Sequence, residues 1–166
     1  MQGVLVPLDG SGACERIVQP ILDHLSPLTH HLLLLRVRSP SEFAAATVPE
    51  ARHGEELEPR FPTMAQAIRS LGVTEIPMDE EAANARVEQE LYPTRRRLES
   101  AGFKVETLVT IGDAAKEIER IVAQREISLI AMTTHGRSGL PRLLMGSVAE
   151  HVVRHVQAPV LLLRSS

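Results

Sequence analysis

Aromatic residues and cysteines are nearly absent from this chain. Its 166 residues include no tryptophan, and phenylalanine and tyrosine together account for only 2% of them. Because sites for single-stranded nucleic acid stack the bases on aromatic rings, we expect no such partner. Cys14 is the only cysteine, which excludes an internal disulfide and a zinc site built on cysteines. The core must therefore be aliphatic.

A strong charge of one sign and long apolar runs are also missing. The formal net charge is −3 at pH 7, which provides no basic footprint for nucleic acid or a membrane surface. No apolar run approaches the length of a membrane span. The first residues lack the basic region of a signal peptide and soon reach Asp9. We therefore expect a cytoplasmic protein with neither a membrane nor a nucleic acid as its partner.

Short apolar runs alternate with amphipathic segments along the chain. Strands are expected at residues 4–8, 32–37, 104–109, 127–133 and 159–164. Helices are expected at 14–25, after Asp113 as N-cap, at 147–156, and at about 79–100 with a bend or break near Pro93. Continuously apolar strands that alternate with helices are typical of parallel sheets. The pattern predicts an α/β fold, a doubly wound five-stranded parallel sheet with helices on both faces.

A single domain is expected over residues 1–166, with an insertion at about 39–78. This stretch contains five prolines and is too long for a simple crossover between two strands. We predict a short helix at 63–71 and a loop over roughly 39–62. The loop is either a lid over a site or an ordinary surface insertion.

The most informative motif begins with Thr133-Thr134-His135-Gly136, continues for nine residues and ends with Gly146-Ser147. It joins an expected strand to an expected helix. Glycines in such a bend let backbone N–H groups approach an anion, and the helix start adds unpaired donors and a positive dipole end. Ser147 and Glu150 have the spacing of a capping box, so we expect the helix to begin at Ser147. The motif predicts a phosphate site.

Asp9 lies at the end of the first expected strand, far from this motif in the sequence. In doubly wound sheets, ligands bind beyond the carboxyl ends of the strands where the strand order reverses. If the first and fourth strands are neighbours there, Asp9 and the Gly136 bend face each other across one crevice. Asp9 then either contacts an adenosine or caps the turn at Gly10–Gly12.

The sequence matches only the first part of the glycine motif G-x-G-x-x-G that binds dinucleotides. Gly10 and Gly12 match its start, but Glu15 occupies the position of the third glycine. Arg36 and Arg38 stand where an acidic ribose ligand is expected after the second strand. These arginines suit a phosphorylated ribose, but no catalytic domain follows. A dehydrogenase is therefore disfavoured.

Five segments together carry a resemblance to a known family: Val6–Ser11, Gly112–Asp113, Thr134–Gly139, Gly146–Glu150 and Ala158–Leu163. They are distributed from the start of the chain to its end and resemble the universal stress protein family, a match that covers most of the chain. The resemblance implies a Rossmann-like fold, often dimeric through pairing of the last strand, here at 159–164. It also implies that some members bind ATP through the motif G-x-x-G, nine residues, G-[ST].

In this chain Thr133 occupies the position of the first glycine of that motif. The resemblance implies that the later glycines and Ser147 hold the phosphates, together with Mg²⁺, while Asp9 and the backbone at Val37 flank the adenosine. Arg137 is the cationic clamp expected within the bend. The full expected binding set is Pro7, Leu8, Asp9, Val37, Met132, Thr133, His135, Gly136, Arg137, Gly139, Gly146, Ser147 and Val148.

Three functions follow from these residues. The first is a homodimeric, ATP-binding regulatory protein of the stress response. The second is an interaction protein of the same fold that dimerises through its last strand and binds no nucleotide. The third is a weak ATP hydrolase, for which His135 is the only apparent general base. We favour the first and assign no catalytic residue.

Overall fold

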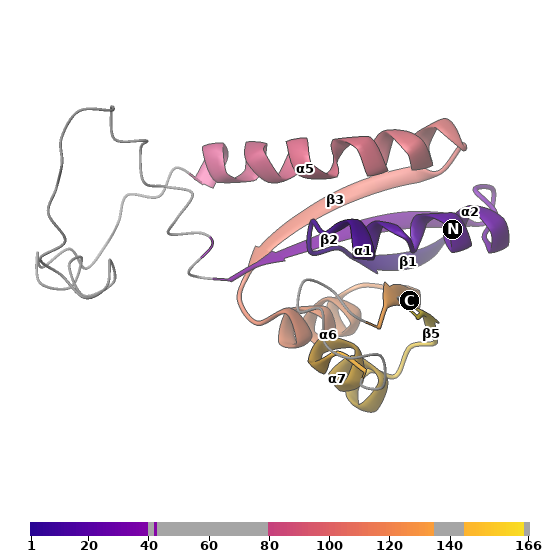
Figure 1. Ribbon diagram of the computed structural model, residues 1–166. Helices are drawn as coiled ribbons and strands as arrows, with labels where there is room; N and C mark the ends of the chain where they lie inside the picture. Colours follow the sequence, from indigo (N-terminus) through magenta and orange to yellow (C-terminus); the bar gives the residue numbers. More distant parts are fainter. Residues whose placement is uncertain (40–41, 43–79, 135–144, 165–166) are drawn as a thin grey trace, which may run out of the picture.

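A five-stranded parallel sheet forms the centre of the computed structural model (Figure 1), which describes residues 1–39, 42, 80–134 and 145–164. Its strands are β1 (Gln2–Pro7), β2 (His30–Arg38), β3 (Lys104–Ile111), β4 (Ile127–Thr133) and β5 (Val160–Leu163). They lie in the order β3-β2-β1-β4-β5, and every neighbouring pair is parallel. The predicted sheet is confirmed.

Helices cover both faces of the sheet, as predicted (Figure 1). On one face lie α1 (Gly12–Glu15), α2 (Val18–His24) and α5 (Glu80–Ser100), and on the other lie α6 (Ala114–Gln124) and α7 (Ser147–His155). Within the described ranges, every helix is too short or too polar to cross a lipid bilayer.

The two faces carry separate aliphatic cores, and β2 contributes to both. Leu32 and Leu34 pack in the cluster beneath α2 and α5, whereas Leu33 and Leu35 pack in the cluster beneath α6 and α7. All four side chains are fully buried. Side chains on a strand alternate between faces, so a run of four leucines supplies both layers at once.

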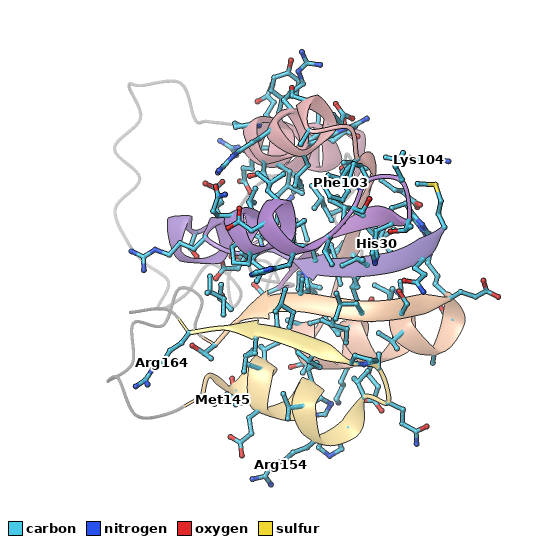
Figure 2. The ribbon with its side chains drawn as sticks, turned by 90° about the vertical axis from the view of Figure 1, so that its right-hand side faces the viewer. His30, Phe103, Lys104, Met145, Arg154 and Arg164 are labelled. Atoms are coloured by element: carbon cyan, nitrogen blue, oxygen red, sulfur yellow. The ribbon has the colours of Figure 1, made fainter. Side chains whose placement is uncertain are left out.

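The strand order reverses between β1 and β4. The chain moves from β1 outward to β2 and β3, and then returns to place β4 on the other side of β1. The helices that follow these two strands, α2 after β1 and α7 after β4, therefore cover opposite faces of the sheet, and a crevice opens at the carboxyl edge between the strand ends. Figure 2 marks this edge with Met145 and Arg164, while His30 and Lys104 lie at the opposite edge.

The helix expected at 14–25 is interrupted, which corrects the sequence prediction. α1 ends at Glu15 and α2 begins at Val18. Pro20 explains the break, because proline has no N–H to donate to the carbonyl of Arg16 and its ring crowds that carbonyl. The apolar stripe is still kept, since Ile17, Val18 and Ile21 are all buried in one cluster.

The break expected near Pro93 is absent, since α5 continues from Glu80 to Ser100 with the proline inside it. Pro93 lies on the exposed face of the helix. The Gln89 carbonyl, which loses its helical donor at this proline, can therefore bond to water instead. The predicted helix at 63–71 lies outside the described residues, as does most of the predicted loop at 39–62.

Asp113 is the N-cap of α6, as predicted from sequence. Its backbone is extended, and its side chain accepts a hydrogen bond from the Lys116 N–H at 3.1 Å. We expect Asp113→Ala to lower the free energy of unfolding by about 1 kcal/mol, while Asp113→Asn, which keeps the acceptor, costs only a few tenths. Urea denaturation of both variants tests this, and equal stability of Asp113→Ala and the parent would contradict the assigned cap.

An ion pair on α6 makes its stability depend on pH. The hydrogen bond from Arg120 Nη2 to Glu117 Oε2, at 2.7 Å, lowers the pKa of the Glu117 carboxyl, although partial burial opposes this. A carboxyl whose pKa is lower in the folded state adds stability above its unfolded pKa of about 4.3. That stability is lost as the pH falls through the folded-state pKa.

We therefore expect Glu117→Gln to reduce the free energy of unfolding by about 0.2–1 kcal/mol at pH 7, since the pair is partly exposed and screened. The difference between variant and parent should disappear below pH ~3, where the parent carboxyl is also neutral. Denaturation midpoints across this pH range give the measurement. Glu126→Gln is the control, because the described residues include no ion-pair partner for Glu126. A deficit that is independent of pH would refute the assignment.

Candidate functional site

A cavity of about 280 Å³ opens at the carboxyl edge, in the crevice between the ends of β1 and β4. Residues from both strands, from the end of β2 and from the first turns of α6 and α7 form its walls. They are Pro7, Leu8, Asp9, Leu35, Val37, Ala114, Ile118, Met132, Thr133, Thr134, Gly146, Ser147, Val148 and Ala149. The walls are mainly apolar, which is typical of small-molecule sites.

The cavity brings together every predicted site residue that the structure describes. These are Pro7, Leu8, Asp9, Val37, Met132, Thr133, Gly146, Ser147 and Val148. The other four predicted residues, His135, Gly136, Arg137 and Gly139, lie outside the described residues. The convergence of residues from the two ends of the chain follows from the pairing of β1 with β4.

Among the described residues that line the cavity, Asp9 is the only ionisable one. Its Oδ1 accepts hydrogen bonds from the Ser11 N–H at 2.8 Å and from the Ser11 hydroxyl at 2.6 Å. Gly10 lies between them with a φ of 77°, a conformation that glycine adopts without strain. The turn-capping role considered from sequence is therefore present, and it fixes the carboxylate at the mouth of the cavity.

The start of α7 differs from the sequence prediction in one respect. The helix does begin at Ser147, but Gly146 is its N-cap and no side chain caps it. The capping box is absent, because Glu150 instead pairs with Arg154 at 2.9 Å. Backbone N–H groups in the first turn of a helix have no partner within the helix. At α7 they open toward the cavity, since Gly146, Ser147 and Val148 all line it.

Backbone hydrogen bonds tie this helix start to the sheet. The Gly146 N–H donates to the Thr134 carbonyl at 2.7 Å, and the Thr134 N–H donates to the Leu163 carbonyl at 2.9 Å. The end of β4, the end of β5 and the N-cap of α7 are thereby held in one arrangement. The N-terminus of α7 cannot move away from the cavity without breaking these bonds.

Thr133 takes an ordinary extended conformation as the last residue of β4, where it pairs with Leu163. Among the described residues, no residue other than glycine has a positive φ. The backbone at this position therefore does not require glycine. The side chain is buried and lines the cavity without closing it.

Arg36 and Arg38 do not line the cavity. They occupy the same face of β2 as Leu32 and Leu34, because side chains alternate along a strand. Both are buried, and Arg36 lies 3.7 Å from Glu90 of α5. The suggestion that these arginines bind a phosphorylated ribose is not supported, since they point to the other side of the sheet.

Sequence reasoning missed part of the cavity wall. Five further residues line it: Leu35, Ala114, Ile118, Thr134 and Ala149. The apolar pattern of Leu35, Ala114 and Ile118 predicted only a strand and a helix face, while Thr134 and Ala149 belong to the motif segments but not to the predicted binding set. The position of α6 and α7 over the sheet edge shows that all five bound a cavity.

A second missed feature follows β2. The Ser39 N–H donates to Glu42 Oε2 and the Glu42 N–H donates to Ser39 Oγ, both at 3.1 Å. These reciprocal bonds form a capping box, which the sequence Ser39-Pro40-Ser41-Glu42 signals by its spacing and by a proline in the second position.

Comparisons with known proteins agree on one family. A sequence model described as the universal stress protein family matches residues 1–164. Universal stress protein MJ0577 of Methanocaldococcus jannaschii is 34% identical over 70 residues, which are 42% of this chain and 43% of that protein. The matched segment thus spans less than half the length of this relative, and 45% of MJ0531 from the same organism.

Solved structures resemble the whole fold. The structure of MJ0577 has a TM-score of 0.72 at 21% identity and covers 99% of this chain and 96% of its own. A universal stress protein in complex with cAMP has a TM-score of 0.62 at 18% identity, with 99% and 98% covered. A family protein from Arabidopsis thaliana with AMP bound has a TM-score of 0.60 at 13% identity, with 100% and 93% covered. At such identities the likeness establishes the fold alone.

Proposed function

The chain belongs to the universal stress protein family, whose sequence model matches residues 1–164, and on this premise we propose that it is a cytoplasmic regulatory protein of the stress response that binds an adenine nucleotide. ATP is the nucleotide we propose. The function rests on binding, and no catalytic residue is assigned.

One observation carries the proposal: an apolar cavity and an uncapped helix N-terminus meet at the point where the strand order reverses. The apolar walls contributed by Val37, Met132 and Ile118 suit a purine ring. The first turn of α7 offers backbone donors and the positive end of a helix dipole to phosphate. A nucleotide has these two chemistries in one molecule.

The volume of the cavity suits only part of a nucleotide. At about 280 Å³, its volume is just below the range for small-molecule sites, which is roughly 300–1,000 Å³. We infer that it holds the nucleoside, while the phosphates extend along the start of α7. The bend residues Gly136, Arg137 and Gly139 lie within five residues of Thr134 in sequence, and we assign them to the phosphates as well.

Asp9 is assigned to the ribose. Ser11 fixes its Oδ1, and a ribose hydroxyl is a natural donor to a carboxylate. Asp9 is the one acidic residue among the described residues that line the cavity, so these residues offer few ligands for a metal. Mg²⁺ would therefore bind mainly through the nucleotide phosphates, as is usual for this ion.

Ligands of related proteins support an adenine nucleotide. Solved structures that share the fold include a universal stress protein in complex with cAMP and a family protein with AMP bound. The alternative, an interaction protein that binds no nucleotide, is favoured by Thr133 in place of glycine. Thr133 is nevertheless extended, and its side chain leaves the cavity open.

We expect Gly146→Val to abolish binding of AMP and ATP without unfolding the protein. The backbone of Gly146, with φ −60° and ψ 149°, is open to valine, but the added methyl groups would occupy the space over the first N–H groups of α7. Isothermal titration calorimetry on the parent and the variant measures the loss, and thermal melting confirms the fold.

Gly12→Ala is the matched control, because an added Cβ at Gly12 meets nothing within 4 Å. It should bind like the parent. Unchanged affinity in Gly146→Val would remove the phosphate assignment. A parent protein that binds neither AMP nor ATP, and releases no nucleotide when it is denatured after purification, would refute the proposed function.

We further propose that the protein is a homodimer through β5. This strand is at the edge of the sheet, and its four apolar residues are only half-buried in the single chain. Edge strands of this kind are generally covered or paired. Sedimentation velocity should find a dimer at micromolar concentration, and Leu161→Lys should shift it to monomer. Val153→Lys, at an exposed position on α7, should not. A monomeric parent would contradict the dimer.

A further inference from the structure

A buried guanidinium lies behind the wall of the cavity. Arg36 is 4% exposed, and its Nη1 donates to the carbonyl oxygen of the next residue, Val37, at 2.7 Å. Arginine stays charged at every physiological pH, and burying a charge is costly unless it is paired and hydrogen-bonded. The burial of this charged side chain therefore needs a structural or functional explanation.

The Val37 carbonyl lies where the sheet no longer provides a partner. The pairing of β1 with β2 ends at Pro7↔Leu35. In a parallel strand the N–H and C=O of one residue point to the same side. Leu35 accepts from the Leu8 N–H, whereas Arg38 accepts from the Gly112 N–H on the β3 side. Two residues beyond Leu35, the N–H and C=O of Val37 therefore face the crevice.

The two carboxylates near Arg36 lie farther from its guanidinium than the Val37 carbonyl oxygen does. Glu90 Oε2 is 3.7 Å from Nε, and Glu42 Oε1 is 3.7 Å from Nη2. Nε is buried and has no hydrogen-bond partner among the described residues. Contacts of 3.7 Å balance charge but exceed hydrogen-bond distance. The short, charge-assisted bond of the guanidinium is thus the one to Val37.

We propose that Arg36 is a positioning residue that fixes the Val37 peptide as the reader of the purine base. This inference rests on the proposed function. A carbonyl oxygen has two lone pairs, so one can accept from Arg36 while the other accepts from an exocyclic amino group of the base. The hydrogen bond holds the peptide plane between Val37 and Arg38. The Val37 N–H belongs to the preceding peptide plane and faces the same crevice. Arg36 acts from behind the wall and does not touch the ligand.

If Arg36 acts through Val37, it affects binding of the purine base but not of the ribose and phosphate. A ligand that contains the base and one that lacks it therefore test the proposal. The probes are AMP and ribose 5-phosphate, whose binding is measured by NMR titration on folded protein. Arg36→Lys keeps the positive charge but loses the planar fork that reaches the carbonyl. We expect it to weaken AMP binding about tenfold, the equivalent of one disturbed hydrogen bond, and to change ribose 5-phosphate binding less than about twofold.

A second variant tests the proposal if Arg36→Lys folds poorly, and a third serves as the control. Glu90→Gln removes one carboxylate beside the guanidinium, and we expect a base-selective loss of up to about fivefold. Arg95→Lys, on the exposed face of α5 in an ion pair with Glu99, is the matched control and should bind both probes like the parent.

The outcomes are distinct. An equal loss for both probes in Arg36→Lys or Glu90→Gln would mean that the arginine merely supports the cavity, and would overturn the proposal. Unchanged AMP binding in Arg36→Lys would overturn it as well, while leaving the proposed function intact. A parent protein that binds neither probe would refute the proposed function, and this proposal with it.

Discussion

The pairing of β4 with β1 is the constraint on which the rest of the structure depends. The chain builds outward from β1 to β3 and then returns to the other side of β1, so that α2 and α7, which follow β1 and β4, cover opposite faces of the sheet. This reversal alone brings Asp9 and Gly146, more than a hundred residues apart, to one cavity. Hydrogen bonds from Gly146 to Thr134 and from Thr134 to Leu163 then fix the start of α7 at the same edge.

The cavity derives its polar character from the backbone rather than from charged side chains. Among the lining residues that the structure describes, only Asp9 is ionisable, and the start of α7 has no side-chain cap. Serine or aspartate at the N-cap would stabilise that helix by only a few tenths of a kcal/mol over glycine. Such a side chain would also occupy the donors that a phosphate needs. Glycine at position 146 thus gives up a little helix stability and leaves an anion site open, a common trade between stability and function.

Much of the fold could be predicted from local patterns, because these patterns have local causes. The leucine run of β2 predicts a strand buried on both faces, and Asp113 predicts the start of α6. The cavity residues Asp9, Gly146 and Ser147 could be named as well, from the glycine motif and the expected adjacency of two strands. Features decided by several segments at once could not be predicted. The hydrogen bond from Arg36 to the Val37 carbonyl depends on where β1 ends. The break before α2 depends on the balance between Pro20, which disfavours the helix, and the apolar stripe, which favours an unbroken one.

The central claim is that one adenine nucleotide lies between the ends of β1 and β2 and the start of α7. The most direct measurement is a titration of ¹⁵N-labelled protein with AMP, followed through the backbone amide resonances. We expect the largest shifts at Asp9, Val37 and residues 146–148, which line the cavity. Shifts confined to the opposite edge of the sheet, near His30 and Lys104, or no shifts at all, would contradict it.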